Sequence, residues 1–292
     1  MSVREPRTRR ERTSVSVLTG PTVIWLLLFF IVPLGVIFVY SFLQRGAFGG
    51  VEWVFQIDNY LRFADALYIN IFVRSLWIAV LTTLICLLIG YPVAFWMSRR
   101  PAWMQGGLLL LIMVPFWTNF VVRMYAWRLL LFRQGILNGF VMGLGLREEP
   151  LALLFTPTAV VIGLVFAWVV NMILPCYASL VGLNDAMLEA AQDLYANRWQ
   201  TFWKVVVPLT MPGIVSGSIL VFVPSLGAYV IPDMLGGGSA DMIGNLIHQQ
   251  FTSGQNWPFG SAISVLLMLT MLIGTLIYFR VARQRTAQGI VG

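Results

Sequence analysis

The sequence predicts an all-α integral membrane protein with six transmembrane helices. Of its 292 residues, 59% are hydrophobic and only 11% are charged, a balance that does not suit a water-exposed surface. The charges are also clustered, and each uncharged stretch between them is long enough for a helix of about 20 residues, which crosses a hydrocarbon core about 30 Å thick. These stretches are residues 13–44, 75–98, 101–122, 150–184, 205–232 and 242–279. The pattern excludes a soluble enzyme, a disordered chain and a disulfide-stapled secreted domain.

The first two spans are expected at about residues 19–43 and 75–97. Residues 1–18 are basic, and we interpret them as a cytoplasmic tail, because the apolar run that follows is too long for a secretory signal. The loop at 45–74 mixes charges with aromatic residues and is expected to form a small folded or interfacial cap. The second span ends at Arg99-Arg100-Pro101, and so short a connection makes spans two and three antiparallel neighbours.

The remaining spans are expected at about residues 105–122, 151–175, 213–231 and 258–279. The third leaves the membrane through aromatic residues that alternate with Arg, a composition typical of a membrane interface. The fifth opens with Gly213 and Gly217, a spacing of small residues that predicts close helix packing. Together the spans form one membrane domain over residues 19–279, followed by a cytoplasmic tail at 280–292.

The basic residues predict that both termini are cytoplasmic. With six spans the termini share a side, and that side carries twelve of the Lys and Arg residues against seven on the other. An excess of positive charge marks the cytoplasmic side. The net charge of +7 is therefore explained by topology and contact with membrane lipid, and it does not indicate nucleic-acid binding.

Several kinds of chemistry are excluded by composition. The chain has one histidine, His248, and one lysine, Lys204, and neither lies in a zinc-protease or phosphate-loop motif. The two cysteines, Cys86 and Cys176, are expected at different depths in the membrane, so neither a disulfide nor a metal pair is expected. We therefore predict no catalytic residue, no metal site and no ATPase site in this chain.

A long cytoplasmic loop at about residues 183–212 separates spans four and five. Asp185 is suited to cap a first short helix that extends to about residue 194, and Asn197 to cap a second that extends to about residue 206. Their apolar and small residues are expected to pack on the bundle or on a partner, while Glu189 and Asp193 stay exposed. These apolar and small residues are Leu188, Ala191, Leu194, Phe202 and Val206.

Residues of this loop also carry a resemblance to a known family. Glu189-Ala190-Ala191, Asp193-Leu194, Phe202 and Pro208-Leu209 resemble the EAA loop of ABC-importer permeases, whose two coupling helices dock on a separate ATPase. Segments 114–119, 155–165, 208–214 and 257–260 are similar to the spermidine/putrescine (PotB-like) branch of that family. The resemblance covers spans two to six and implies the binding-protein-dependent (MetI-like) permease architecture.

One residue of the loop departs from the family pattern. The family has Gly where this chain has Tyr195, and Gly there allows a left-handed backbone turn that costs a bulky residue about 1 kcal/mol or more. Either Asn197 takes over the turn or Tyr195 is strained. The residues that the resemblance assigns to ATPase coupling are Leu188, Glu189, Ala190, Ala191, Asp193, Leu194, Tyr195, Asn197 and Pro208.

The resemblance implies a transport function and a set of partners. We expect a permease subunit of an ATP-driven polyamine importer in the bacterial inner membrane, working by alternating access and binding no cofactor itself. Its implied partners are a homologous permease (PotC-like), two ATPase subunits (PotA-like) that use ATP, and a substrate-binding protein (PotD-like). The alternatives are an ABC permease for another small solute and a secondary cation transporter, although no span interior holds a carboxylate to relay protons.

Physical chemistry suggests which residues line the path of a polycation. Ammonium groups that lose their hydration need aromatic faces and oxygen atoms in compensation. Residues of that kind near the expected path are Trp117, Asn119, Asn171, Tyr229 and Asp233. For each of them, packing, a helix-to-helix hydrogen bond or a solvated loop position is the competing interpretation.

Overall fold

A computed structural model describes residues 20–238 and 240–288, so the predicted tail at 1–18 lies outside the described residues. Within these residues, four helices are long and apolar enough to cross a membrane: Gly20–Tyr40, Ala66–Ser98, Pro157–Val181 and Trp257–Arg280. Two further pairs of helices pass the same test if each bent pair is one span, which gives up to six spans. The described part of the chain divides into two compact units.

The first unit consists of the N-terminal segment to Phe63 and residues 250–266. Its first span contains a π-helical turn, η1 (Leu27–Ile31), followed by α2 (Val32–Tyr40). The loop expected to fold is an antiparallel hairpin, β1 (Leu43–Arg45) and β2 (Val51–Phe55), followed by helix α3 (Asp58–Phe63). The buried amide of Asn59 donates to the carbonyl oxygens of Ser41 and Leu43, at 3.0 and 2.9 Å, and so joins α3 to the hairpin.

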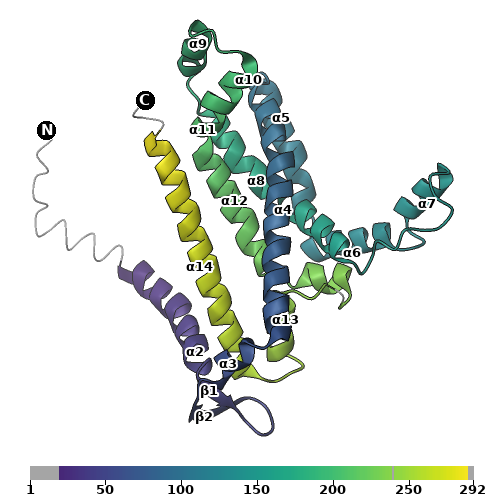
Figure 1. Ribbon diagram of the computed structural model, residues 1–292, viewed down its shortest axis with the longest axis vertical. Coiled ribbons are helices and arrows are strands. Elements are labelled where there is room, and N and C mark those ends of the chain that lie inside the picture. The colour runs from purple at the N-terminus through teal and green to yellow at the C-terminus, as the bar shows by residue number, and fades with distance from the viewer. Residues whose placement is uncertain (1–19, 239, 289–292) are drawn as a thin grey trace, which may run out of the picture. The chain divides into compact units, whose positions relative to one another are not determined.

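The second unit contains most of the helices, and the colours of Figure 1 show their order along the chain. They are α4 (Ala66–Ser98), α5 (Ala102–Met113), η2 (Val114–Trp117), α6 (Phe120–Leu131), α7 (Ile136–Gly143), α8 (Pro157–Val181), α9 (Asp185–Asp193), α10 (Arg198–Thr201), η3 (Phe202–Val206), α11 (Val207–Leu209), α12 (Met211–Leu226) and η4 (Pro232–Gly236). Helix α13 (Ile243–Phe251) begins in this unit, and its last two residues belong to the first unit. Helix α14 (Trp257–Gln288) begins in the first unit and continues into the second.

Helices α4, α8 and α12 lie side by side and form the core of the second unit (Figure 1). Their contacts depend on small residues. A Cβ atom added at Gly213 would lie 2.5 Å from the carbonyl oxygen of Pro175, and one added at Gly217 would lie 2.8 Å from the sulfur of Met172. The predicted small-residue packing of span five is therefore confirmed, with α8 as its partner.

The predicted third span is wrong in its geometry. Residues 102–117 and 120–143 form two helical segments that meet at an angle of 87°. The oxygen of the Asn119 side chain accepts from the backbone N–H of Val121 at 2.8 Å, so Asn119 starts a new helix at the bend. The span predicted at about residues 105–122 is therefore broken near residue 118, and its last residues belong to the next helix.

The ends of other spans also differ from the prediction. Helix α4 starts at Ala66 rather than 75, and α12 ends at Leu226 rather than 231. Helix α8 starts at Pro157 instead of 151, because Thr156 caps it and Pro157 occupies its first turn. It also continues past Pro175 to Val181, since neighbouring helices tolerate a proline within a span. Helix α14 reaches Gln288, within the segment predicted as a tail; residues 289–292 are not described.

Candidate functional site

The loop between α8 and α12 forms two short helical arms. Helix α9 ends where the backbone N–H of Ala196 donates to the carbonyl oxygen of Ala191 at 3.1 Å, the six-residue bond of a Schellman cap. The residue of such a cap that adopts the left-handed conformation is Tyr195, with φ of 56°. Of the two predicted possibilities, strain at Tyr195 is therefore the one found. The expected cap by Asp185 involves a side chain outside the described set.

The second arm starts at Asn197, as predicted. Its side chain accepts from the backbone N–H of Gln200 at 2.8 Å, and the Gln200 side chain accepts from the N–H of Asn197 at 3.1 Å. This reciprocal pair is a capping box. The helical path then continues through η3 and α11, which contains the predicted Pro208, and bends by 64° into α12.

One face of the loop packs on the bundle. Leu188 and Val206 are buried in a cluster with Met97, Cys176 and Leu180 from the ends of α4 and α8. The ring of Phe202 meets the ring of Phe95 edge-on, with centroids 5.3 Å apart. Ala191 is also buried, but Leu194 is 82% exposed, so of its two expected positions, against the bundle or against a partner, the bundle contact is not found.

The opposite face of the loop is open. Glu189, Ala190, Asp193 and Pro208 are exposed there, and Tyr195 is 95% exposed. Two large aromatic residues that the sequence analysis did not select, Trp199 and Trp203, are also exposed. Exposed apolar residues beside carboxylates are typical of a surface that binds another protein.

A pair of hydroxyl groups stabilises the bend between the loop and α12. The hydroxyl groups of Tyr91 and Thr210 lie 2.8 Å apart, and that of Thr210 also donates to the carbonyl oxygen of Val206 at 2.8 Å. Both residues are buried. The bend is therefore attached to the last third of α4.

Two of the five candidate path residues lie at the break between η2 and α6. Trp117 is 74% exposed at the end of η2. Asn119 is exposed and uses its side-chain oxygen to cap α6. A structural role for Asn119 is thus established, whether or not it also contacts substrate.

The other three candidates lie on α8 and beyond α12. Asn171 is half-buried within α8, and its backbone carbonyl loses its intrahelical donor because Pro175, four residues later, has no N–H. Tyr229 stacks on His248 with ring centroids 4.8 Å apart. Asp233 is exposed at the start of η4, and its backbone N–H donates to the carbonyl oxygen of Tyr229 at 3.0 Å. Tyr229 and Asp233 are therefore neighbours.

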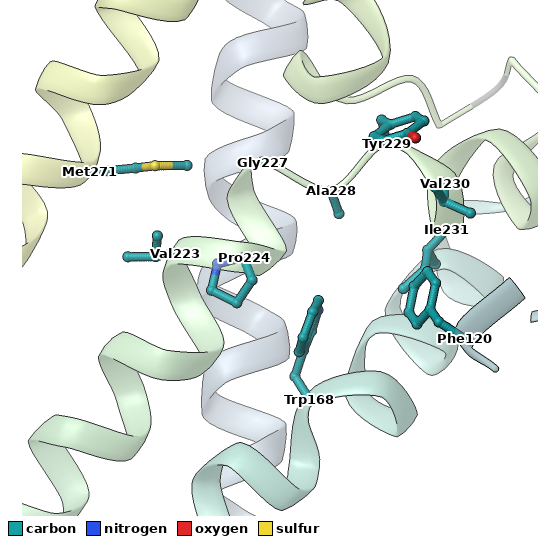
Figure 2. Close-up of a pocket in the computed structure, with 10 residues that line it drawn as sticks. All are labelled: Phe120, Trp168, Val223, Pro224, Gly227, Ala228, Tyr229, Val230, Ile231 and Met271. Carbon is teal, nitrogen blue, oxygen red and sulfur yellow. The ribbon is translucent and has the colours of Figure 1, made fainter. Parts of the chain in front are cut away.

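A cavity of about 470 Å³ adjoins Tyr229 (Figure 2). It lies at the end of α12, where the chain leaves the helix. Its lining residues are Phe120, Trp168, Val223, Pro224, Gly227, Ala228, Tyr229, Val230, Ile231 and Met271. Trp168 and Phe120 were missed in the sequence, although Trp168 is one helical turn from Asn171 and Phe120 follows Asn119.

Comparisons with known proteins agree on one family. The model of the binding-protein-dependent transport system inner membrane component matches residues 86–286. The spermidine/putrescine transport system permease protein PotB of Escherichia coli (strain K12) is 42% identical over 259 residues, covering 89% of this chain and 94% of that protein. PotB of Haemophilus influenzae is 40% identical over 256 residues, or 88% and 90% of the two chains.

A solved structure shares the fold. A chain of the bacterial alginate ABC transporter, in complex with an alginate pentasaccharide-bound periplasmic protein, superposes with a TM-score of 0.78. The match covers 95% of this chain and 96% of that chain at 16% sequence identity. At this identity the likeness extends to the arrangement of helices and not to the cargo.

Proposed function

Because the chain belongs to the family of inner-membrane components of binding-protein-dependent transport systems, we propose that it is the permease subunit of an ATP-driven importer whose cargo is a polyamine, spermidine or putrescine. The observation that carries this proposal is the 42% identity with a spermidine/putrescine permease over 89% of the chain. An importer of this kind needs a partner permease, an ATPase and a periplasmic binding protein. We assign these roles to PotC-like, PotA-like and PotD-like subunits.

The loop at 183–212 is the proposed contact with the ATPase. Its open face presents Glu189, Asp193 and the exposed Leu194 and Tyr195, while Leu188, Ala191 and Val206 attach the loop to α4 and α8. A surface fixed on one side and open on the other passes the movement of a bound partner to the bundle. In this proposal the ATPase subunits bind and hydrolyse ATP, and this chain has neither an ATPase site nor a cofactor.

Transport proceeds by alternating access in this proposal. Closure of the ATPase pair draws the coupling loops of the two permeases together and opens the path outward, where the binding protein delivers substrate. The proposed orientation places both termini and the loop in the cytoplasm, in keeping with the excess of Lys and Arg on that side. Trp117, Asn119, Asn171, Tyr229 and Asp233 are the proposed residues of the path.

The test is uptake by the complete importer in vesicles. Labelled spermidine and putrescine are supplied with the binding protein outside and ATP inside, and the wild type is compared with Glu189→Ala. We expect ATP-dependent uptake that falls with Glu189→Ala and stays unchanged with Glu52→Ala, which removes an exposed carboxylate from β2 instead.

Each alternative has its own result. ATP-driven uptake of a different solute, with no uptake of either polyamine, would retain the importer and reject the polyamine cargo. Uptake by this chain alone, driven by an ion gradient without ATP, would identify a secondary cation transporter. Equal loss in the Glu189 and Glu52 variants would contradict the proposed coupling surface.

A further inference from the structure

We propose that the cavity at the end of α12 is a binding site for the alkylammonium chain of the substrate, with the rings of Trp168 and Tyr229 as its specific contacts. The inference rests on the proposed function and adds a site to it. Figure 2 shows Trp168 of α8 and Tyr229 of the segment after α12 among the lining residues, with Pro224 and Gly227 at the α12 terminus. All of the lining residues belong to the second unit.

The composition of the lining selects a class of ligand. None of the ten lining residues is charged, and their side chains are almost entirely apolar. An oxyanion or a sugar would leave its polar groups without partners in such a cavity, which is costly. A polyamine differs because uncharged methylene segments separate its ammonium groups. The apolar wall suits those segments, and about 470 Å³ holds an extended chain of that width.

The aromatic rings supply attraction for the ammonium groups. A cation over the face of an indole or phenol is attracted by the ring quadrupole, most strongly by Trp. Trp168 is half-buried, where such an attraction is weakly screened, and Tyr229 remains 45% exposed although His248 stacks on it. Phe120 also lines the cavity, but the guanidinium of Arg123 already lies 5.9 Å from its ring centroid. We therefore assign the binding of the cation to Trp168 and Tyr229.

The end of α12 adds negative potential. This helix spans 16 residues, Met211–Leu226, and its C-terminal turn lines the cavity through Val223 and Pro224. The C-terminal end of a helix carries partial negative charge and favours a cation. In the same turn, the buried hydroxyl group of Ser225 has no hydrogen-bond partner among the described residues. The exposed carboxylate of Asp233 lies one turn beyond Tyr229 and adds a full negative charge nearby.

The experiment measures how much polyamine is transported for each ATP hydrolysed. The complete importer is reconstituted in vesicles with saturating, spermidine-loaded binding protein, so that the affinity of the binding protein does not limit the result. The variants are Trp168→Leu and Tyr229→Leu, with Trp168→Phe and Tyr229→Phe as versions that keep a ring. Trp127→Leu is the matched control, because Trp127 is also half-buried but contacts Phe166 away from the cavity.

We expect each Leu variant to lower the ratio of transported spermidine to hydrolysed ATP by about 2- to 30-fold, the range that loss of one cation–π contact allows. The Phe variants and Trp127→Leu lose less than the corresponding Leu variant and stay near the wild-type ratio, and the ATPase copurifies with all of them. Wild-type ratios in both Leu variants would overturn the site. So would an equal loss in Trp127→Leu or in the Phe variants, since packing alone would then explain it.

The same data separate this inference from the proposed function. If the wild type transports spermidine and the Leu variants match it, only the cavity site is rejected. If the wild type transports neither spermidine nor putrescine, the polyamine cargo and the site fail together.

Discussion

Replacing Tyr195 with Gly is expected to stabilise the loop at 183–212. Tyr195 adopts a φ of 56°, a left-handed conformation that costs an ordinary residue about 1–2 kcal/mol and costs Gly almost nothing. Its ring is 95% exposed, so its removal sacrifices almost no buried surface. The greater freedom of Gly in the unfolded chain opposes the gain by about 0.4–1 kcal/mol. The net stabilisation of the α9 cap is therefore between about 0 and 1.6 kcal/mol, and the middle of that range, about 0.5–1 kcal/mol, is the expected gain.

Hydrogen exchange measures this gain locally. The backbone N–H groups of Leu194 and Ala196 donate to Ala190 and Ala191 at the end of α9, at 3.3 and 3.1 Å, and they report opening of the cap. A gain of about 0.5–1 kcal/mol slows exchange about 2- to 5-fold in the Gly variant. Tyr195→Ala is the control, because it removes the ring but keeps the Cβ atom that causes the strain. Equal exchange in the Gly and Ala variants would refute the reasoning.

Three other changes have expected outcomes. Asn197→Ala removes the cap of α10 and is expected to lower its local stability by about 1 kcal/mol, read as faster amide exchange in residues 198–201, whereas Asn197→Asp keeps the cap. Gly217→Val forces a side chain against Met172 and is expected to destabilise the protein by about 1–3 kcal/mol, measured by thermal unfolding in detergent. At Gly106 an added side chain meets open space, so Gly106→Val is expected to change the stability little. Asn138→Leu leaves the backbone N–H of Leu151 without its acceptor at 2.9 Å and is expected to lower the free energy of unfolding by about 1–3 kcal/mol. Gln134→Leu, which replaces an exposed amide nearby, is expected to have little effect. Equal melting temperatures of the two variants would contradict the role of Asn138.

Much of the architecture follows from local signals in the sequence. Long uncharged runs predict spans because lipid tolerates few charges, and Asn197 predicts a helix start because its side chain satisfies a free backbone N–H. The Gly213 and Gly217 pair predicts close helix packing, which is found against α8. Each of these signals can be recognised within one continuous segment of the sequence.

Three features of the structure do not follow from the local sequence pattern. Asn119 remains a candidate residue of the path, and the structure adds a second role, because its side chain caps a helix at an 87° bend that the sequence pattern does not predict. Pro175 was read as the end of a span, but α8 continues beyond it because its neighbours α4 and α12 pack along it. Trp168 lines the cavity only because the chain turns away after Leu226, a tertiary feature that no local pattern predicts.

The close approach of α8 and α12 limits how the bundle can move. Because Gly213 and Gly217 have no side chain, α12 packs directly against Pro175 and Met172 of α8, and sliding either helix along the other would bring larger side chains of α12 into the contact. We therefore expect α8 and α12 to move together as one rigid unit. The loop at 183–212 connects the end of α8 to the start of α12, so it is attached to both helices at the same end of the pair. We therefore expect a displacement of the loop to move the far ends of both helices together, along with the cavity beyond Leu226.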